Sequence, residues 1–183
     1  TANPDIVYGA LVGFGQSGPY AKRPAYDDII QGVSGMADMQ GGREGPPQFI
    51  NAAVCDKICS QVAVHAIIAA LFSRLKTGKG QLVEVPMYES MVGFNLVEHQ
   101  AGETFEPPLG PAGYERSMVE YRRPFATTDG YVCVLPYNTK QWQSFLVAMG
   151  REDLRNDVRV TDPKTRSEKI GELYELVAAL VRD

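Results

Sequence analysis

The sequence predicts an α/β protein with a parallel sheet, followed by a smaller part that combines a β-hairpin with helices. Two short β-prone runs, Ile6–Val12 and Gln81–Met87, flank a long helical pattern, and this order of elements favours parallel strands. The first run shows no strict alternation of polar and apolar residues, which is typical of a strand buried on both faces. The segment Glu103–Gly113, rich in proline and glycine, then indicates a domain boundary or linker.

The first predicted strand runs directly into a glycine-rich loop, Gly13–Tyr20. In α/β sheets, ligands commonly bind where a strand ends in such a loop. The Gly-x-Gly of this loop lacks the rest of the dinucleotide-binding spacing, and prolines interrupt the segment that follows. An NAD site is therefore not favoured, and a tight surface loop is the simpler interpretation.

A short helix is predicted over Ile29–Ala37, after the run RPAYDD at residues 23–28. Either Asp27 or Asp28 can cap the start of this helix. The two glycines within it each weaken a helix by about 1 kcal/mol relative to alanine. We therefore expect close packing against another backbone to explain them.

The longest helical pattern contains a single carboxylate near its start, Asp56. Apolar residues recur at i, i+4 spacing up to Leu75, and Gly78 and Gly80 provide the stop signal. In or just before the first turn of a helix, free N–H groups and the positive end of the dipole favour an ionised carboxylate. Asp56 is then either a nucleophile or a helix cap, and the cap is the commoner role for such a residue.

The rest of the chain predicts one more helix of the first part and the elements of the second. A helix follows the second strand from about Tyr88 to Gln100. In the second part, Asp129-Gly130 lies between two β-prone runs and predicts a hairpin with a type I′ turn. Helices are then predicted over 139–149 and 165–182, the last with an apolar stripe.

Composition excludes several classes of function. The net charge is −4, which does not favour nucleic acid or an anionic membrane, and the longest apolar run ends at Arg74 and Lys76 before it reaches the length of a membrane span. Three cysteines with no framework spacing indicate free thiols in the cytoplasm. Cys55 and Cys59 stand four apart, but no second pair of Cys or His residues accompanies them, so a metal site is not expected. We expect the chain to be part of a longer protein.

Several stretches together resemble the class III (CaiB/BaiF-type, formyl-CoA transferase-like) CoA-transferases. They are NPDIVYGALVGFGQSGPYAKRPAYDDIIQGVSG, GPPQFINAAVCD, AALFSRLKTGKGQLVEVPMYES and PFATTDGYVCV, in this order. The resemblance implies an open Rossmann-like large domain, here partial over residues 1–105. It also implies a linker and part of a smaller α+β domain over 106–183. Members of the family form interlocked homodimers and are roughly twice as long as this chain.

The resemblance implies that Asp56 is the nucleophile that attacks an acyl-CoA thioester. A mixed anhydride and an aspartyl-CoA thioester follow, and a free carboxylic acid then accepts CoA through a second anhydride. Coenzyme A is a substrate here, and no tightly bound cofactor, metal, nicotinamide or flavin is implied. The resulting oxyanions need N–H donors, which we expect from the helix start around Asp56 and from the glycine-rich segments.

Two alternatives to the transferase remain. The α-methylacyl-CoA racemases of the same fold carry a histidine where this chain has Tyr26, and an unperturbed tyrosine, with a pKa near 10, is a poor general base at neutral pH. The other alternative is a non-catalytic segment, inactive by itself. By the same resemblance, Pro24, Ala25, Tyr26 and Asp27 are expected to contact CoA and substrate, although Asp27 is equally well explained as a cap.

Overall fold

A computed structural model of the protein describes residues 3–182, and the chain divides into two compact units. Unit 1 comprises Thr1–Gly41 and Pro46–Pro111, and unit 2 comprises Gly42–Gly45 and Ala112–Asp183. The division between the units along the chain thus falls after Pro111, within the predicted linker and six residues later than the expected boundary at 105. The short segment 42–45 belongs to unit 2, which the sequence did not indicate.

Unit 1 contains the predicted parallel strands. Strand β1 (Val7–Val12) pairs with β2 (Gln81–Pro86) in parallel, with Val7 opposite Gln81 and Val12 opposite Pro86. The connection between them holds three helices: α1 (Asp27–Val33), α2 (Met36–Gly41) and α3 (Val54–Thr77). Unit 1 is therefore mixed α/β with a small parallel sheet, and the prediction of parallel strands around a helical crossover is confirmed.

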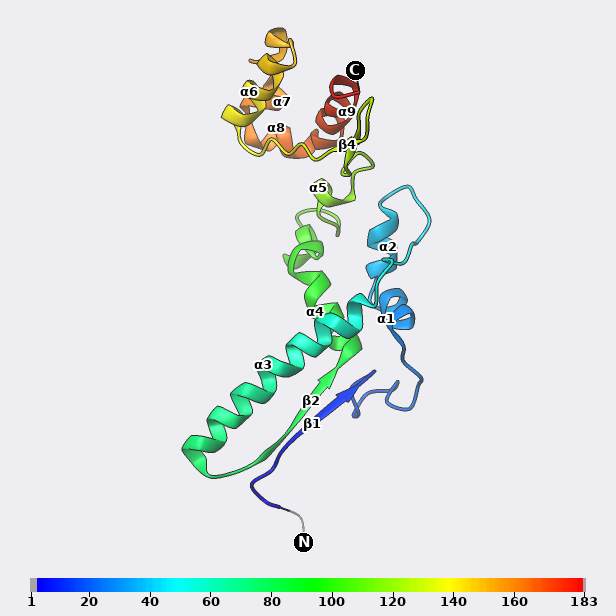
Figure 1. The fold of residues 1–183 in the computed structure, drawn as a ribbon, viewed down its shortest axis with the longest axis vertical. Helices are drawn as coiled ribbons and strands as arrows, with labels where there is room; N and C mark the ends of the chain where they lie inside the picture. Colours follow the sequence, from blue (N-terminus) through cyan, green and yellow to red (C-terminus); the bar gives the residue numbers. More distant parts are fainter. Residues whose placement is uncertain (1–2, 183) are drawn as a thin grey trace. The chain divides into compact units, whose positions relative to one another are not determined.

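Helix α3 is the longest element of unit 1 and lies along both strands and α4 (Met87–His99) (Figure 1). Its 24 residues correspond to about 36 Å at 1.5 Å per residue. Gly78 adopts the left-handed conformation, with φ of 70°, and its N–H donates to the Arg74 carbonyl. The predicted helix and its glycine stop are therefore confirmed.

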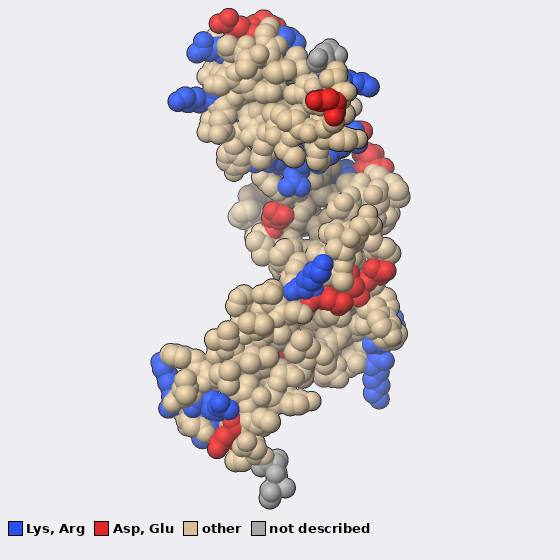
Figure 2. Space-filling model, viewed as in Figure 1, with Lys and Arg blue, Asp and Glu red and all other residues tan. Residues whose placement is uncertain are grey.

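The exposed side of α3 is unusually apolar. Residues 58–73 contain no Lys, Arg, Asp or Glu, and Figure 2 shows the visible face over the middle of α3 almost free of charged side chains. By length and composition α3 is sufficient to cross a membrane, contrary to the expectation that no run reaches that length. A mostly buried core helix of a soluble protein passes the same test, but only 17% of the apolar window of α3 is buried, although α3 packs on both strands of the sheet. His65 lies on the exposed part of this helix.

The predicted helix over 29–37 is two helices, α1 and α2. The break falls at Ser34 and Gly35, where Gly35 has a φ of 81°, a conformation that interrupts a helix and favours glycine. Close packing does not explain Gly32, since a methyl group there would meet nothing within 4 Å among the described residues. Gly35 is thus retained by backbone conformation, and no neighbouring backbone accounts for Gly32.

A glycine at the end of β1 has a clear steric reason. A Cβ atom at Gly13 would lie 2.0 Å from the Ala25 Cβ, so the loop before α1 can pass this close only beside glycine. The core of unit 1 lies next to this contact and consists of Phe14, Ile30, Met36, Cys55, Cys59 and Met91. After α4 the unit ends with a 3₁₀ turn, η1 (Ala101–Thr104), and an irregular segment.

Unit 2 is mainly helical, with one small hairpin of β3 (Phe125–Ala126) and β4 (Tyr131–Val132). The predicted hairpin is confirmed, but the prediction of a type I′ turn is wrong. Neither Asp129 nor Gly130 has the positive φ that this turn requires, and Thr127 N–H instead closes a wider loop onto the Gly130 carbonyl. The helical elements are α5 (Glu115–Met118), α6 (Thr139–Ala148), η2 (Glu152–Leu154), α7 (Val158–Thr161), α8 (Pro163–Glu168) and α9 (Ile170–Leu180).

The helix predicted over 165–182 is also divided, into α8 and α9, because Lys169 leaves the helical conformation. The apolar stripe of α9 packs into the core of unit 2, as predicted. That core consists of Phe125, Trp142, Leu146, Val160, Ile170, Leu173, Tyr174 and Val177.

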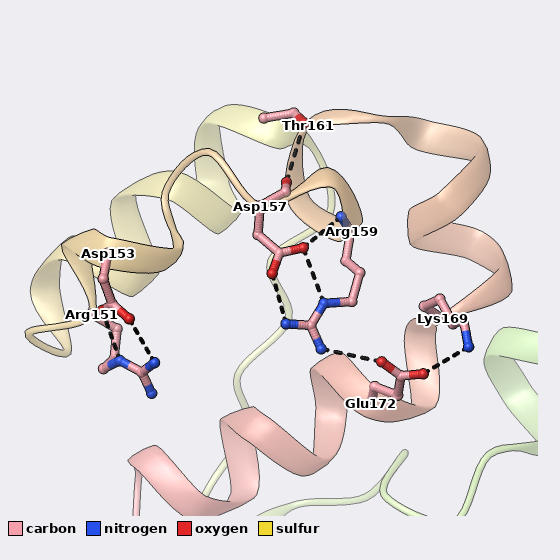
Figure 3. Close-up of polar contacts among 7 residues, drawn as sticks. All are labelled: Arg151, Asp153, Asp157, Arg159, Thr161, Lys169 and Glu172. Atoms are coloured by element: carbon pink, nitrogen blue, oxygen red, sulfur yellow. Dashed lines mark hydrogen bonds and ion pairs between the residues drawn. The ribbon is translucent and has the colours of Figure 1, made fainter.

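A charged network joins α7 to α9 beside this core (Figure 3). Arg159 donates to both carboxylate oxygens of Asp157, at 3.0 and 2.7 Å, and to Glu172 at 3.1 Å, and Lys169 pairs with the same Glu172 at 2.9 Å. The hydrogen bonds from Arg159 lower the pKa of Asp157 below its ordinary value.

Candidate functional site

Asp56 lies in the first turn of α3, as predicted. The helix begins at Val54 with Ala53 as the N-cap, so Asp56 occupies the third helical position and is not the cap. Its side chain is exposed, and none of the hydrogen bonds described for residues 3–182 involves its carboxylate oxygens. The carboxylate is therefore accessible to a ligand while its backbone belongs to a well-formed helix.

The backbone of Asp56 is held by a second aspartate from α1. The Asp56 N–H donates to Asp27 Oδ1 at 3.0 Å, across 29 positions of the sequence. The expected cap of α1 by Asp27 or Asp28 is wrong, because the N-cap is Tyr26 and no side chain caps that helix start. Asp27 instead accepts a first-turn N–H of α3, where Ala53 has no side-chain oxygen to do so.

Gln31, which the sequence did not single out, fixes Asp27 in place. Its side chain is completely buried, and its Nε2 donates to Asp27 Oδ2 at 2.7 Å. Its Oε1 accepts the Ile50 N–H at 2.8 Å, in the segment just before α3. The one available sequence signal was the spacing of Asp27 and Gln31, four apart on a helix and able to interact.

Two buried thiols flank Asp56 and are poor nucleophiles. Burial, followed by the charges of Asp27, Cys59 and Asp56, raises the pKa of Cys55 to about 12. Burial and the same two aspartates also raise the pKa of Cys59. Because the thiolate is the reactive form, both buried cysteines stay protonated and poorly reactive near neutral pH.

The backbone donors expected to stabilise an oxyanion are largely engaged within the chain. At the start of α3, the N–H groups of Val54 and Lys57 donate to backbone carbonyls and that of Asp56 to Asp27. In the loop after β1, Gly15 N–H donates to Glu89 and Gln16 N–H to Glu84, both at 2.9 Å. These two carboxylates hold the loop, so the N–H groups of Gly15 and Gln16 are not available to a ligand in this structure.

The residues expected to contact CoA lie next to the two aspartates in sequence but differ in exposure. Pro24 is exposed and Tyr26 is 73% exposed, whereas Ala25 is half-buried beside Gly13. Asp27 is half-buried and occupied by its two hydrogen bonds. Residues 3–182 contain no group of three or more His, Cys, Asp or Glu side chains placed to hold a metal ion.

Comparison with known proteins identifies the family. The profile described as CoA-transferase family III matches residues 1–183, the whole of this sequence. The chain belongs to CoA-transferase family III. The family III resemblance seen in the sequence motifs is thereby confirmed.

Relatives in family III include characterised and named transferases. The chain is 32% identical to the "Probable fatty acyl-CoA transferase Rv3272" of Mycobacterium tuberculosis, over 97% of this chain and 48% of that protein. It is 30% identical to the succinyl-CoA:mesaconate CoA-transferase of Haloarcula hispanica, over 85% of this chain and 40% of that protein. The human succinyl-CoA:glutarate CoA-transferase is 29% identical, over 94% and 41% respectively.

Solved family III structures share this fold. A crystal structure of Rv3272 superposes with a TM-score of 0.75 at 28% identity, covering 99% of this chain and 48% of the other. A CaiB/BaiF family protein from Brucella suis gives a TM-score of 0.73, also at 28% identity with 99% and 48% coverage. The chain thus spans about half of the length of its relatives.

Proposed function

We propose that the protein of which this chain is part transfers CoA from an acyl-CoA donor to a free carboxylic acid, with Asp56 as the nucleophile. The observation that supports this most directly is the position of Asp56 in a family III chain. Its carboxylate is exposed, its backbone is fixed by Asp27, and the neighbouring thiols are neutral. Among nucleophilic groups at the start of α3, the carboxylate is the one suited to react.

In the proposed reaction, Asp56 attacks the donor thioester carbonyl. A C–O bond forms and the C–S bond breaks, so that CoA departs as the thiolate and a mixed anhydride remains on Asp56. The thiolate then attacks the Asp56 carbonyl. The donor acid is released, and Asp56 remains as an aspartyl-CoA thioester. The acceptor carboxylate attacks this thioester, which breaks its C–S bond, releases CoA thiolate and forms a second anhydride. The thiolate then attacks the acceptor carbonyl of that anhydride. Acceptor-CoA leaves and the Asp56 carboxylate is restored.

The residues before α1 have separate roles in this proposal. Asp27 is a positioning residue, because it holds the Asp56 backbone through a hydrogen bond and is itself held by Gln31. The exposed Pro24 and Tyr26, with Ala25 behind them, are proposed to contact CoA or substrate. Tyrosine at position 26, where the racemases carry histidine, favours the transferase over proton abstraction.

The remaining expectations complete the proposal. We propose that β1 and β2 belong to a larger, open Rossmann-like sheet, that the protein is an interlocked homodimer, and that it acts in the cytoplasm. Three free cysteines in the sequence support the last point. The donor is proposed to be an acyl-CoA and the acceptor a small carboxylic acid, since the named relatives transfer CoA between such compounds.

Isotope transfer in the full-length protein tests the nucleophile directly. Succinyl-CoA is incubated with a panel of carboxylic acids labelled with ¹⁸O in the carboxylate, and acyl-CoA products are followed by mass spectrometry. After a single turnover, the peptide that contains Asp56 is expected to carry one ¹⁸O from the acceptor, and further turnovers are expected to add a second. Asp56→Ala is expected to abolish exchange, whereas Asp28→Ala, an exposed neighbour, is expected to retain it.

Two results would contradict the proposal. Exchange that persists in Asp56→Ala would exclude this nucleophile. Wash-out of an α-proton into deuterated water without any acceptor acid, and without CoA exchange, would instead support a racemase.

A further inference from the structure

A pocket of about 190 Å³ lies entirely within unit 2 and contains no residue of the Asp27–Asp56 site. Two arginines from different helices line it, Arg116 of α5 and Arg166 of α8. Its other lining residues are Tyr114, Pro136, Tyr137, Trp142, Pro163, Ser167 and Ile170, and no acidic side chain is among them.

The two arginines of the pocket differ from the other half-buried arginines of unit 2. Arg151 pairs with Asp153, and Arg159 with Asp157 and Glu172 (Figure 3). Arg116 instead donates to the Tyr174 hydroxyl at 2.9 Å, and its guanidinium lies 4.5 Å from the centre of the Tyr137 ring.

Arg166 likewise bonds to neutral groups, the Thr139 hydroxyl at 3.1 Å and the Val160 carbonyl at 2.7 Å. In the described part of unit 2, neither pocket arginine is paired with a carboxylate in any ion pair. The pocket therefore holds two positive charges that no acidic group neutralises.

Trp142 lies behind the wall of the pocket. Its side chain is completely buried, and its Nε1 has less than 1 Å² of accessible surface and no hydrogen-bond partner among the described residues. A ligand oxygen in the pocket therefore does not reach this N–H, but the indole lies close enough to report whether the pocket is filled.

We propose that this pocket binds the carboxylate of a small organic acid. The carboxylate would pair with Arg116 and Arg166, since a guanidinium suits a planar carboxylate. Pro136, Pro163 and Ile170 provide apolar surface for a short hydrocarbon part. The volume is below the range typical of drug-sized ligands, which restricts the ligand to a few carbon atoms.

The test uses the full-length protein with ¹⁵N-labelled tryptophan, in an Asp56→Ala background without acyl-CoA. Trp142 is the one tryptophan of this sequence, and Trp142→Phe assigns its indole resonance. Butyrate is expected to shift that resonance in a saturable manner, and the uncharged isostere butyramide is not. Because the probe reports on the indole itself, the outcome is independent of whether Asp56 is a nucleophile.

Matched variants distinguish the pocket from general charge effects. Arg116→Gln is expected to weaken butyrate binding by about tenfold, as for the loss of a charge-assisted hydrogen bond. Arg122→Gln, an exposed arginine of the same unit outside the pocket, is expected to leave it unchanged. Arg116→Lys keeps the charge without the planar fork and replaces Arg116→Gln if the latter does not fold. No saturable shift, an equal shift with butyramide, or an unchanged affinity in the Arg116 variant would overturn the proposal.

Discussion

The buried amide of Gln31 donates to the carboxylate of Asp27 at 2.7 Å, one helical turn earlier on α1. The other oxygen of that carboxylate accepts the Asp56 N–H. A single side chain thus connects α1 to the first turn of α3, and a buried glutamine determines its orientation. The backbone geometry at the proposed nucleophile thus depends on the side chains of Asp27 and Gln31.

Asp27→Ala is expected to destabilise unit 1 by about 1–3 kcal/mol, because the Asp56 N–H loses its acceptor and the buried Gln31 amide loses the nearest of its three. Urea unfolding of the full-length protein measures the change. The control is Asp28→Ala, the adjacent exposed aspartate of the same helical turn. Equal losses from the two variants would show that the hydrogen bonds of Asp27 contribute little.

Gly13→Ala and Gly32→Ala are expected to change stability in opposite directions. At Gly13 the new methyl group would lie 2.0 Å from Ala25 Cβ, and overpacking of this kind costs about 1–3 kcal/mol. At Gly32, in the interior of α1, alanine meets no neighbour and is expected to stabilise by about 0.5–1 kcal/mol. Thermal unfolding of both variants decides this, and a destabilised Gly32→Ala would reveal packing against a part of the protein beyond this chain.

Asp157→Asn is expected to reduce the loss of stability in acid. The pKa of Asp157 is lower in the folded protein than its ordinary value of 3.8, mainly through its hydrogen bonds with Arg159. Its contribution is therefore present above pH 3.8 and is lost as the pH falls further. The variant keeps an oxygen for the Arg159 N–H and should lose about 1 kcal/mol at neutral pH.

Urea midpoints between neutral pH and acid measure the effect of Asp157→Asn. The variant is expected to approach the wild type as the pH falls. Asp153→Asn, in the more exposed pair with Arg151, serves as the control and should change less. A constant difference across the pH range would contradict the linkage.

Cys55→Ala is expected to flatten the loss of stability in alkali. The pKa of Cys55 is raised from 9.0 to about 12, so the folded state retains a proton that the unfolded state releases. Stability from this group is complete below pH 9 and decreases as the pH rises toward 12. Urea midpoints from about pH 8 to pH 11 should fall more steeply in the wild type than in the variant. Cys133→Ala, at an exposed position, is the control and should follow the wild type.

Local sequence patterns predicted the elements of unit 1 but not the contacts that build the site. The β-prone runs, the helical spacing of α3 and the stop at Gly78 depend on neighbouring residues, and all three were predicted. The bond from Asp27 to Asp56 depends on how α1 and α3 meet, so the sequence suggested only a local cap. The break at Gly35 was missed because glycine within an apolar pattern does not reveal the sign of its φ angle.

The same distinction holds in unit 2. The hairpin was predicted from Asp129-Gly130, but its turn geometry was wrong, since the loop closes between Thr127 and Gly130 without a positive φ. The Arg116 and Arg166 pocket was not predicted at all. Its residues come from α5, α6, α8, α9 and the segments before α5 and α6, and only the packing of these elements brings them together.

Position 56 contributes to the fold through its main-chain N–H and to the proposed chemistry through its side chain. Replacement of the carboxylate therefore leaves the anchoring hydrogen bond available. A catalytically silent protein altered at Asp56 should retain its native scaffold and accept intact donor and acceptor together. Such a variant is a suitable starting point for crystallising the proposed ternary complex, in which the bound acid would be directly visible.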